Sequence, residues 1–130
     1  MKDFRELEVW RRAHVLNRWV YALVGHYPGL VRYGLAAQMR RSSVAIATNI
    51  AEACGAFENN GGRWYFNAAL GSVASLECLV FLALEMGLIP DARAQWFTET
   101  AVDIRTMLRS SLAEKETTDD KSPASLTLVQ

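Results

Sequence analysis

Apolar residues recur at intervals of three and four positions through most of this chain, which is the spacing of one face of an α-helix. Four stretches carry the pattern, at residues 4–26, 30–55, 62–86 and 91–114. Between them lie residues that end or start helices, namely Pro28, Gly61-Gly62, Gly87 and Pro90. Because the connections are short, the pattern predicts an all-α, antiparallel up-down-up-down four-helix bundle.

The stretch at residues 62–86 is apolar on nearly every side of the expected helix. Helices of this kind are buried all round. Four helices in one bundle leave each helix a solvent face, so we expect part of this helix to pack against another subunit. Val15 and Trp19 lie on the mostly polar side of the first helix and are further candidates for an oligomer interface.

The composition changes after Glu114 to mainly Glu, Thr, Asp, Lys, Ser and Pro. Such a segment cannot bury enough apolar surface to order itself. The bundle is therefore expected to span residues 1–114, and residues 115–130 are expected to form a disordered tail. Weak alternation at residues 126–129 leaves docking on a neighbour as the alternative for this tail.

The chain of 130 residues has the length of one domain. It has no apolar run of transmembrane length and no pattern of a signal peptide, so we expect a cytoplasmic protein without a membrane partner. Its two cysteines, Cys54 and Cys78, fall on apolar helix faces. Buried free thiols are favoured there over a disulfide.

Charge is unevenly spread, although the net charge is zero. Residues 1–63 hold nine lysines and arginines against five acids, whereas residues 64–130 hold five against nine. The halves thus carry +4 and −4. This asymmetry suits nucleic-acid contact or self-association of unlike surfaces, and intermixing of the charges within one folded bundle is the alternative.

Several arginines are candidates for nucleic-acid binding, namely Arg11, Arg12 and Arg18 on the first helix and Arg63 at a loop. Guanidinium groups suit phosphates, and Trp64 and Tyr65 offer rings on which bases can stack. The neutral net charge argues against strong binding. A protein-interaction adaptor without nucleic-acid binding therefore stays open.

Polar residues form an ordered stripe on the helix at residues 30–55, at spacings of three, four and seven. Together with a carboxylate of the next helix they are predicted to form a structural polar cluster, whose members are Gln38, Arg40, Arg41, Asn49, Glu52 and Glu77. Glu77 lies within an apolar stripe, where an unpaired carboxylate is costly. We expect it to pair with Arg40 or Arg41 and to fix the register of the helices, because no second titratable group completes an acid–base site.

Sequence motifs of catalysis are missing from the chain. Neither histidine follows a glutamate at the spacing of a di-iron bundle, and the cysteines and histidines match no zinc pattern. No nucleophile elbow or phosphate-binding glycine loop is present. We expect no enzyme activity, no metal and no cofactor.

A family resemblance is carried by several motifs: Tyr33-Gly34-Leu35, Arg40-Arg41, Asn49-Ile50-Ala51-Glu52, Gly71-Ser72 and Leu76-Glu77. Over about residues 4–112 the chain resembles the four-helix-bundle proteins encoded within intervening sequences of bacterial large ribosomal RNA. The accessory protein of diversity-generating retroelements is a distant relative of that family. The resemblance implies that the protein forms a homopentameric ring and that it acts together with RNA. Ala45, Ala53 and Ala56 stand where the family usually has Ser, Gly and Arg.

Two hypotheses for function follow. The first is a non-catalytic oligomeric assembly module that binds RNA or a ribonucleoprotein partner through surface arginines. The second is a protein–protein interaction adaptor whose charge asymmetry serves subunit packing. Its protein partner is not specified by the sequence.

Overall fold

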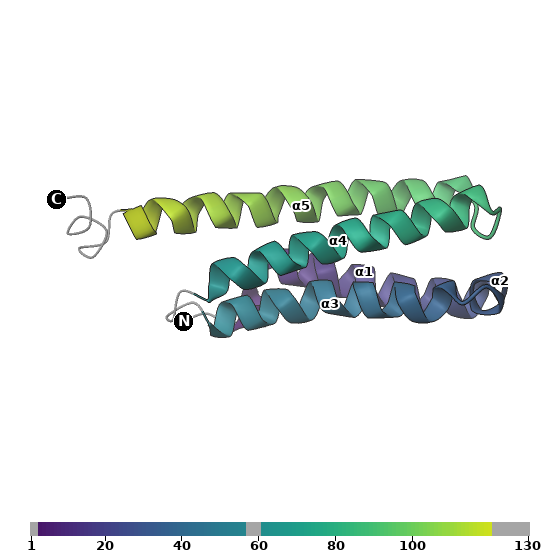
Figure 1. Ribbon diagram of the computed structural model, residues 1–130, viewed down its shortest axis with the longest axis horizontal. Coiled ribbons are helices and arrows are strands. Elements are labelled where there is room, and N and C mark those ends of the chain that lie inside the picture. Colours follow the sequence, from purple (N-terminus) through teal and green to yellow (C-terminus); the bar gives the residue numbers. More distant parts are fainter. Residues whose placement is uncertain (1–2, 57–60, 121–130) are drawn as a thin grey trace.

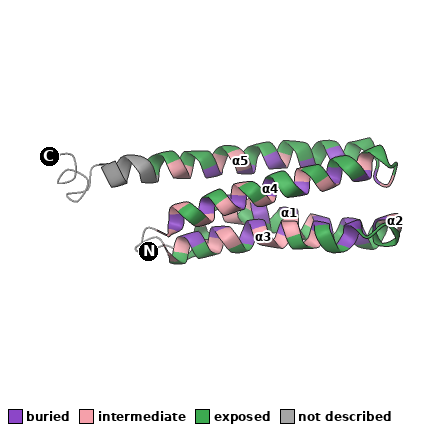
Figure 2. Ribbon diagram, in the orientation of Figure 1, coloured by how far each residue is buried: buried purple, intermediate pink, exposed green. Residues whose placement is uncertain are grey.

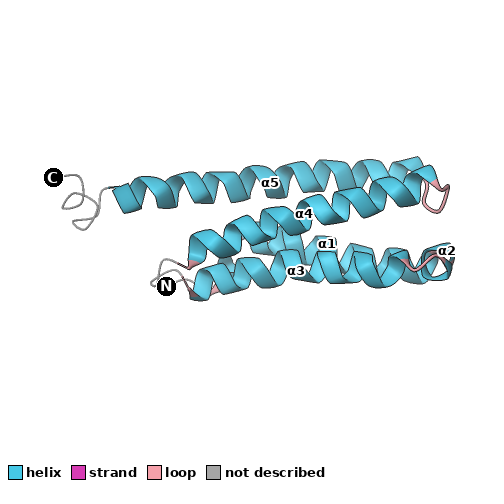
Figure 3. Ribbon diagram, in the orientation of Figure 1, coloured by secondary structure: helices cyan, strands magenta, loops and turns pink. Residues whose placement is uncertain are grey.

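The computed structural model describes residues 3–56 and 61–120, with side chains as far as residue 114. All regular structure within these residues is helical (Figure 3). In chain order the elements are the 3-10 helix η1 (Phe4–Glu6) and the α-helices α1 (Glu8–His26), α2 (Gly29–Arg32), α3 (Leu35–Gly55), α4 (Gly62–Glu85) and α5 (Asp91–Asp120).

The four long helices lie side by side, and consecutive ones run in opposite directions (Figure 1). Helix α3 packs most extensively against α4, and α1 contacts α3 on one side and α5 on the other. Because α4 also packs against α5, the order around the bundle is α1, α3, α4, α5. Helices that follow one another in sequence are neighbours in space, which confirms the predicted all-α four-helix bundle.

Each long helix buries one stripe of side chains toward a common core (Figure 2). The largest fully buried apolar side chains come from the four long helices and from α2: Leu16 and Val20 of α1, Leu30 of α2, Met39, Ile46 and Ile50 of α3, Val73 and Leu76 of α4, and Phe97, Ile104 and Leu108 of α5. Full burial of one such side chain contributes about 1.5–3 kcal/mol. The core therefore fixes which face of each helix looks outward.

One polar contact inside this core joins α1 to α3. Ser43 is fully buried, and its hydroxyl lies 2.8 Å from Oδ1 of Asn17 and 3.0 Å from the carbonyl oxygen of Arg40. A buried hydroxyl needs such partners, since leaving it unpaired costs about 1–3 kcal/mol. This contact holds the middle of α1 against the first half of α3.

The first predicted helix does not start as expected, because the backbone is extended at Leu7. Asp3 therefore caps η1 instead of α1: its carboxylate accepts hydrogen bonds from the backbone and the guanidinium of Arg5. These bonds lower the pKa of Asp3 to about 2. The prediction of one helix over residues 4–26 was thus wrong at its first turn.

Two further boundaries differ from the prediction. The second helix divides into α2 and α3 at Gly34, whose φ of 75° lies in the left-handed region. Helix α5 continues to Asp120, beyond the predicted end at Glu114, because charged residues such as Lys115 and Glu116 extend a formed helix readily. Residues 121–130 of the predicted disordered tail lie outside the described residues.

Candidate nucleic-acid interface

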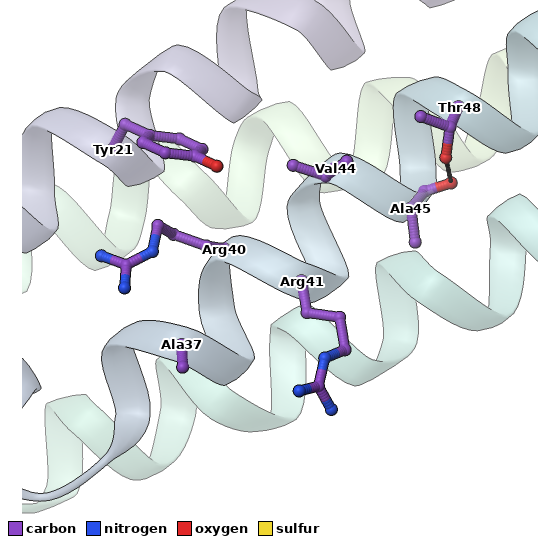
Figure 4. Close-up of a pocket in the computed structure, with 7 residues that line it drawn as sticks. All are labelled: Tyr21, Ala37, Arg40, Arg41, Val44, Ala45 and Thr48. Carbon is purple, nitrogen blue, oxygen red and sulfur yellow. Dashed lines mark hydrogen bonds between the residues drawn. The ribbon is translucent and has the colours of Figure 1, made fainter.

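An open groove of about 420 Å³ lies where α1 meets α3. Its lining residues are Tyr21 from α1 and Ala37, Arg40, Arg41, Val44, Ala45 and Thr48 from α3 (Figure 4). The α3 residues follow one another at helical intervals, so the helix itself places them on one outward side. Ala37 and Ala45 are small, which leaves the space between the larger side chains.

Tyr21 reaches this groove because of the polar contact in the core. Asn17 lies one turn earlier on α1 and is fixed to Ser43 of α3, so the next turn of α1 lies beside Arg40. The guanidinium carbon of Arg40 lies 5.9 Å from the centre of the Tyr21 ring. Figure 4 shows the ring of Tyr21 next to Arg40, with Arg41 extending from the other side of α3.

Three arginines on these two helices lack an acidic partner among the described residues. Arg40 and Arg41 form no ion pair there, and neither does Arg18, which is exposed one turn before Tyr21 on α1. We call Arg18, Arg40 and Arg41 the basic face. Like charges on adjacent helices repel one another, so this surface favours a bound anion.

The other arginines that the sequence singled out have different surroundings. Arg11 lies 3.4 Å from a carboxylate oxygen of Glu8, and Arg12 donates to Glu8 at 3.2 Å and to Asp103 at 2.8 Å. Arg63 is half-buried at the start of α4. It therefore lies near the C-terminal end of α3, whereas Arg40 lies near the N-terminal end of that helix. Of the four candidates, Arg18 is the one that belongs to the basic face.

The aromatic pair proposed for base stacking also lies away from the groove. Trp64 and Tyr65 meet edge to face, with ring centres 5.0 Å apart, in the first turn of α4. The aromatic residue that accompanies the arginines of the basic face is Tyr21. Its spacing of three residues from Arg18 was visible in the sequence, but its contact with Arg40 depends on how α1 and α3 pack.

The predicted polar cluster is not assembled. Glu77 pairs with Arg105 of α5 and not with Arg40 or Arg41, so the predicted partner was wrong. The reason is geometric: α4 has α3 on one side and α5 on the other, and Glu77 lies on the α5 side. Gln38 and Glu52 are exposed, and Asn49 is half-buried on α3.

A second groove, of about 290 Å³, lies between α1 and α5. Exposed Val15 lines it together with Trp96 and the ion pair of Arg12 and Asp103. Trp19 is half-buried within the chain, with its ring centre 5.1 Å from that of Trp96 and 5.8 Å from that of Phe97. A role of Val15 and Trp19 in an oligomer interface stays a prediction.

The two cysteines differ in exposure. Cys54 is half-buried, and burial raises the pKa of its thiol, whereas Cys78 is exposed on α4. The expectation that both are buried was wrong for Cys78, because the apolar face on which it lies points away from the core. Among the residues with described side chains, no three His, Cys, Asp or Glu side chains gather in a way that would hold a metal ion.

That outward face of α4 is largely apolar. Gly71, Ala74, Cys78, Phe81 and Leu82 lie along it and are exposed, and we call them the α4 stripe. By length and composition alone α4 could cross a membrane, since its mean hydropathy reaches 1.7 over an 18-residue window. Only 28% of that window is buried within the bundle.

Comparison with known proteins places this helical bundle in a family. The family model described as 23S rRNA-intervening sequence protein matches residues 5–110, and the chain belongs to this family. The family has no known catalytic activity and its function is unknown. No curated protein matches the chain.

A solved structure shares the fold. It is the crystal structure of a protein of unknown function from the S23 ribosomal protein family of Bacteroides thetaiotaomicron. The two chains are 21% identical and superpose with a TM-score of 0.68, over 80% of this chain and 97% of that one. The likeness concerns the arrangement of the helices.

Proposed function

We propose that this protein is a non-catalytic assembly module that binds the phosphates of RNA through the basic face. The observation that carries the proposal is the set of three arginines, Arg18, Arg40 and Arg41, on adjacent helices without an acidic partner among the described residues. The planar guanidinium group of arginine matches phosphate oxygens in geometry and charge. The name of the family, which refers to an intervening sequence of 23S rRNA, supports RNA as the polyanion.

The groove beside these arginines supports a binding role more than a catalytic one. Its lining offers two guanidinium groups, one phenol and one threonine hydroxyl, but no carboxylate or imidazole. The side chains that most often act as general acid or base are thus lacking from this lining. The hydroxyl of Thr48 donates a hydrogen bond to the carbonyl oxygen of Ala45, which occupies its proton within α3.

Assembly forms the second part of the proposal, and the α4 stripe supports it. Contiguous exposed apolar surface of this kind marks a protein or membrane contact. A second copy of the chain fits better than lipid, because the neighbouring helices expose charged side chains such as Arg41, Glu52 and Glu99. A bilayer against α4 would also meet these charges, at several kcal/mol each. The homopentameric ring implied by the family resemblance is our proposed form.

Assembly would also strengthen the binding of RNA. One chain presents the three arginines of the basic face and is neutral as a whole. A ring repeats the basic face once for each subunit, so that several weak phosphate contacts act on one RNA molecule at a high effective concentration.

The experiment is a salt titration of RNA binding, followed by fluorescence anisotropy of a labelled RNA. Each neutralised phosphate adds about −0.7 to the slope of log affinity against log salt on single strands. The double variant Arg40→Gln, Arg41→Gln should bind more weakly and with a slope that is flatter by up to about 1.4 for each subunit engaged.

The matched control is the double variant Arg93→Gln, Arg109→Gln, which removes the same charge from exposed positions of α5. It should bind RNA nearly as the parent does. Absence of binding by the parent at low salt, or equal loss in both variants, would favour the adaptor hypothesis instead.

A further inference from the structure

We propose that the groove between α1 and α3 holds one unpaired nucleotide of an RNA strand, with its base stacked on Tyr21 and the adjoining phosphates on Arg40 and Arg41. The inference rests on the proposed function and adds the class of RNA that the site selects. It follows from three features of the groove: the exposed ring, the flanking cations and the open shape.

The ring of Tyr21 is available for stacking. The residue is 52% exposed, although its side chain is large and aromatic. Among the described residues its ring makes no contact with another aromatic ring, and the guanidinium of Arg40 lies over it. A base on such a ring contributes stacking, and the guanidinium beside it adds a cation–π interaction.

The two cations flank the apolar part of the groove. Arg40 and Arg41 are consecutive residues of α3, so their side chains leave the helix in different directions, as Figure 4 shows. Between them the groove offers Ala37 and Val44 to the base and sugar, and Ala45 lies beyond Arg41. A nucleotide within a strand has a phosphate on each side, which matches a pair of guanidinium groups separated by an apolar surface.

The open shape argues for a nucleotide within a strand over a free one. The volume of about 420 Å³ is in the range of small-molecule sites, but the groove is largely open to solvent. It would bury too little of a free nucleotide for tight binding, whereas a strand can continue beyond both ends. Bases of a duplex have both faces covered by their neighbours, so only an unpaired base can reach Tyr21.

The test compares a labelled single-stranded RNA of mixed sequence with an RNA duplex of the same length, at one low salt concentration. The parent should prefer the single strand. Tyr21→Ala should lose about fivefold to one hundredfold in affinity for the single strand and almost none for the duplex. Tyr21→Phe keeps the ring and should bind as the parent does.

Trp64→Ala serves as the matched control, because Trp64 is an exposed aromatic residue that lies outside the groove. It should leave both affinities unchanged. Light scattering of each variant shows whether the assembly is intact. Circular dichroism shows whether the helices are folded.

Three outcomes would overturn the proposal in distinguishable ways. If Tyr21→Ala binds single strands like the parent while Arg40→Gln, Arg41→Gln binds weakly, the phosphate site stands and the stacked base does not. If Tyr21→Ala dissociates the assembly, the groove is covered by a second copy of the chain. If the parent binds neither RNA, the proposed function fails as well.

Discussion

At the scale of single residues, the neighbouring charges decide what each arginine of this protein can do. Arg12 lies between Glu8 and Asp103, whose carboxylates neutralise it. Arg40 lies against the ring of Tyr21, which attracts the cation but leaves its charge uncompensated. Helical spacing reveals which arginines share a face of one helix. The effect of Asp103 on Arg12 could not be predicted, because that carboxylate comes from a helix distant in sequence.

The ion pair of Glu77 and Arg105 leads to a prediction about stability. Their side chains are 32% and 24% exposed, so solvent screens the pair in part. In a double-mutant cycle of Glu77→Gln and Arg105→Gln, urea unfolding should give a coupling energy of about 1 kcal/mol or less, well below the 3–5 kcal/mol cost of breaking a fully buried pair.

A second cycle provides the control for this pair. Glu77→Gln combined with Arg41→Gln should show no coupling, because Arg41 forms no ion pair among the described residues. Measurable coupling to Arg41 together with none to Arg105 would mean that α4 turns Glu77 toward α3 and not toward α5.

At the scale of the elements, two glycines in the left-handed region end or divide helices. Gly34 separates α2 from α3 with a φ of 75°, and Gly87 follows α4 with a φ of 73°. After α4 the amide of Gly87 donates a hydrogen bond to the carbonyl oxygen of Leu84. The amide of Leu88 donates one to the carbonyl oxygen of Ala83. This pair of bonds satisfies carbonyl groups that the end of a helix leaves free.

Replacing Gly34 by alanine should destabilise the protein by about 1–2 kcal/mol, because an L-residue is strained at this φ. The space around its Cβ is open, so a steric clash would not contribute. Gly25→Ala is the matched control, since Gly25 lies in α1 with equally open surroundings. Gly25→Ala should raise the free energy of unfolding, measured by chemical denaturation, by at most about 0.5–1 kcal/mol. Equal effects of both substitutions would contradict the left-handed turn at Gly34.

The order and number of the long helices could be predicted because apolar spacing and short connections suffice for them. Boundaries were harder to predict. The break at Leu7 follows from the cap that Asp3 provides for η1, and a preference for that cap over a longer helix is not visible in residue types. The groove was missed as well, since Tyr21 and Arg40 belong to different helices and meet only through the packing that Ser43 and Asn17 direct.

At the scale of the whole molecule, the charge asymmetry of the sequence becomes a difference between two sides of the bundle. Residues 3–56, which include α1 and α3, hold seven arginines against four acids. Residues 61–114, which include α4 and most of α5, hold four arginines against six acids. Because α1 and α3 are neighbours, these charges are partly separated in space, although Arg12 and Asp103 join the two sides.

Assembly through the α4 stripe predicts the mass of the protein in solution. Light scattering after size exclusion should give a multiple of the chain mass of 14.5 kDa, five times in the proposed ring. Phe81→Glu places a charge in the stripe and should reduce the mass toward that of the monomer. Val31→Glu is the matched control, because Val31 on α2 is also 60% exposed and lies outside the stripe. A parent protein that is monomeric at micromolar concentration would contradict assembly.

The measurement that tests the central claim most directly is the position of RNA on the protein. Ultraviolet cross-linking of a bound single-stranded RNA, followed by trypsin and mass spectrometry, identifies the residues that touch it. The peptide of residues 19–32 should carry the cross-link, at Tyr21, and this cross-link should weaken in Arg40→Gln, Arg41→Gln. A cross-link confined to Trp64 or Tyr65, or none on α1 or α3, would contradict RNA binding by the basic face.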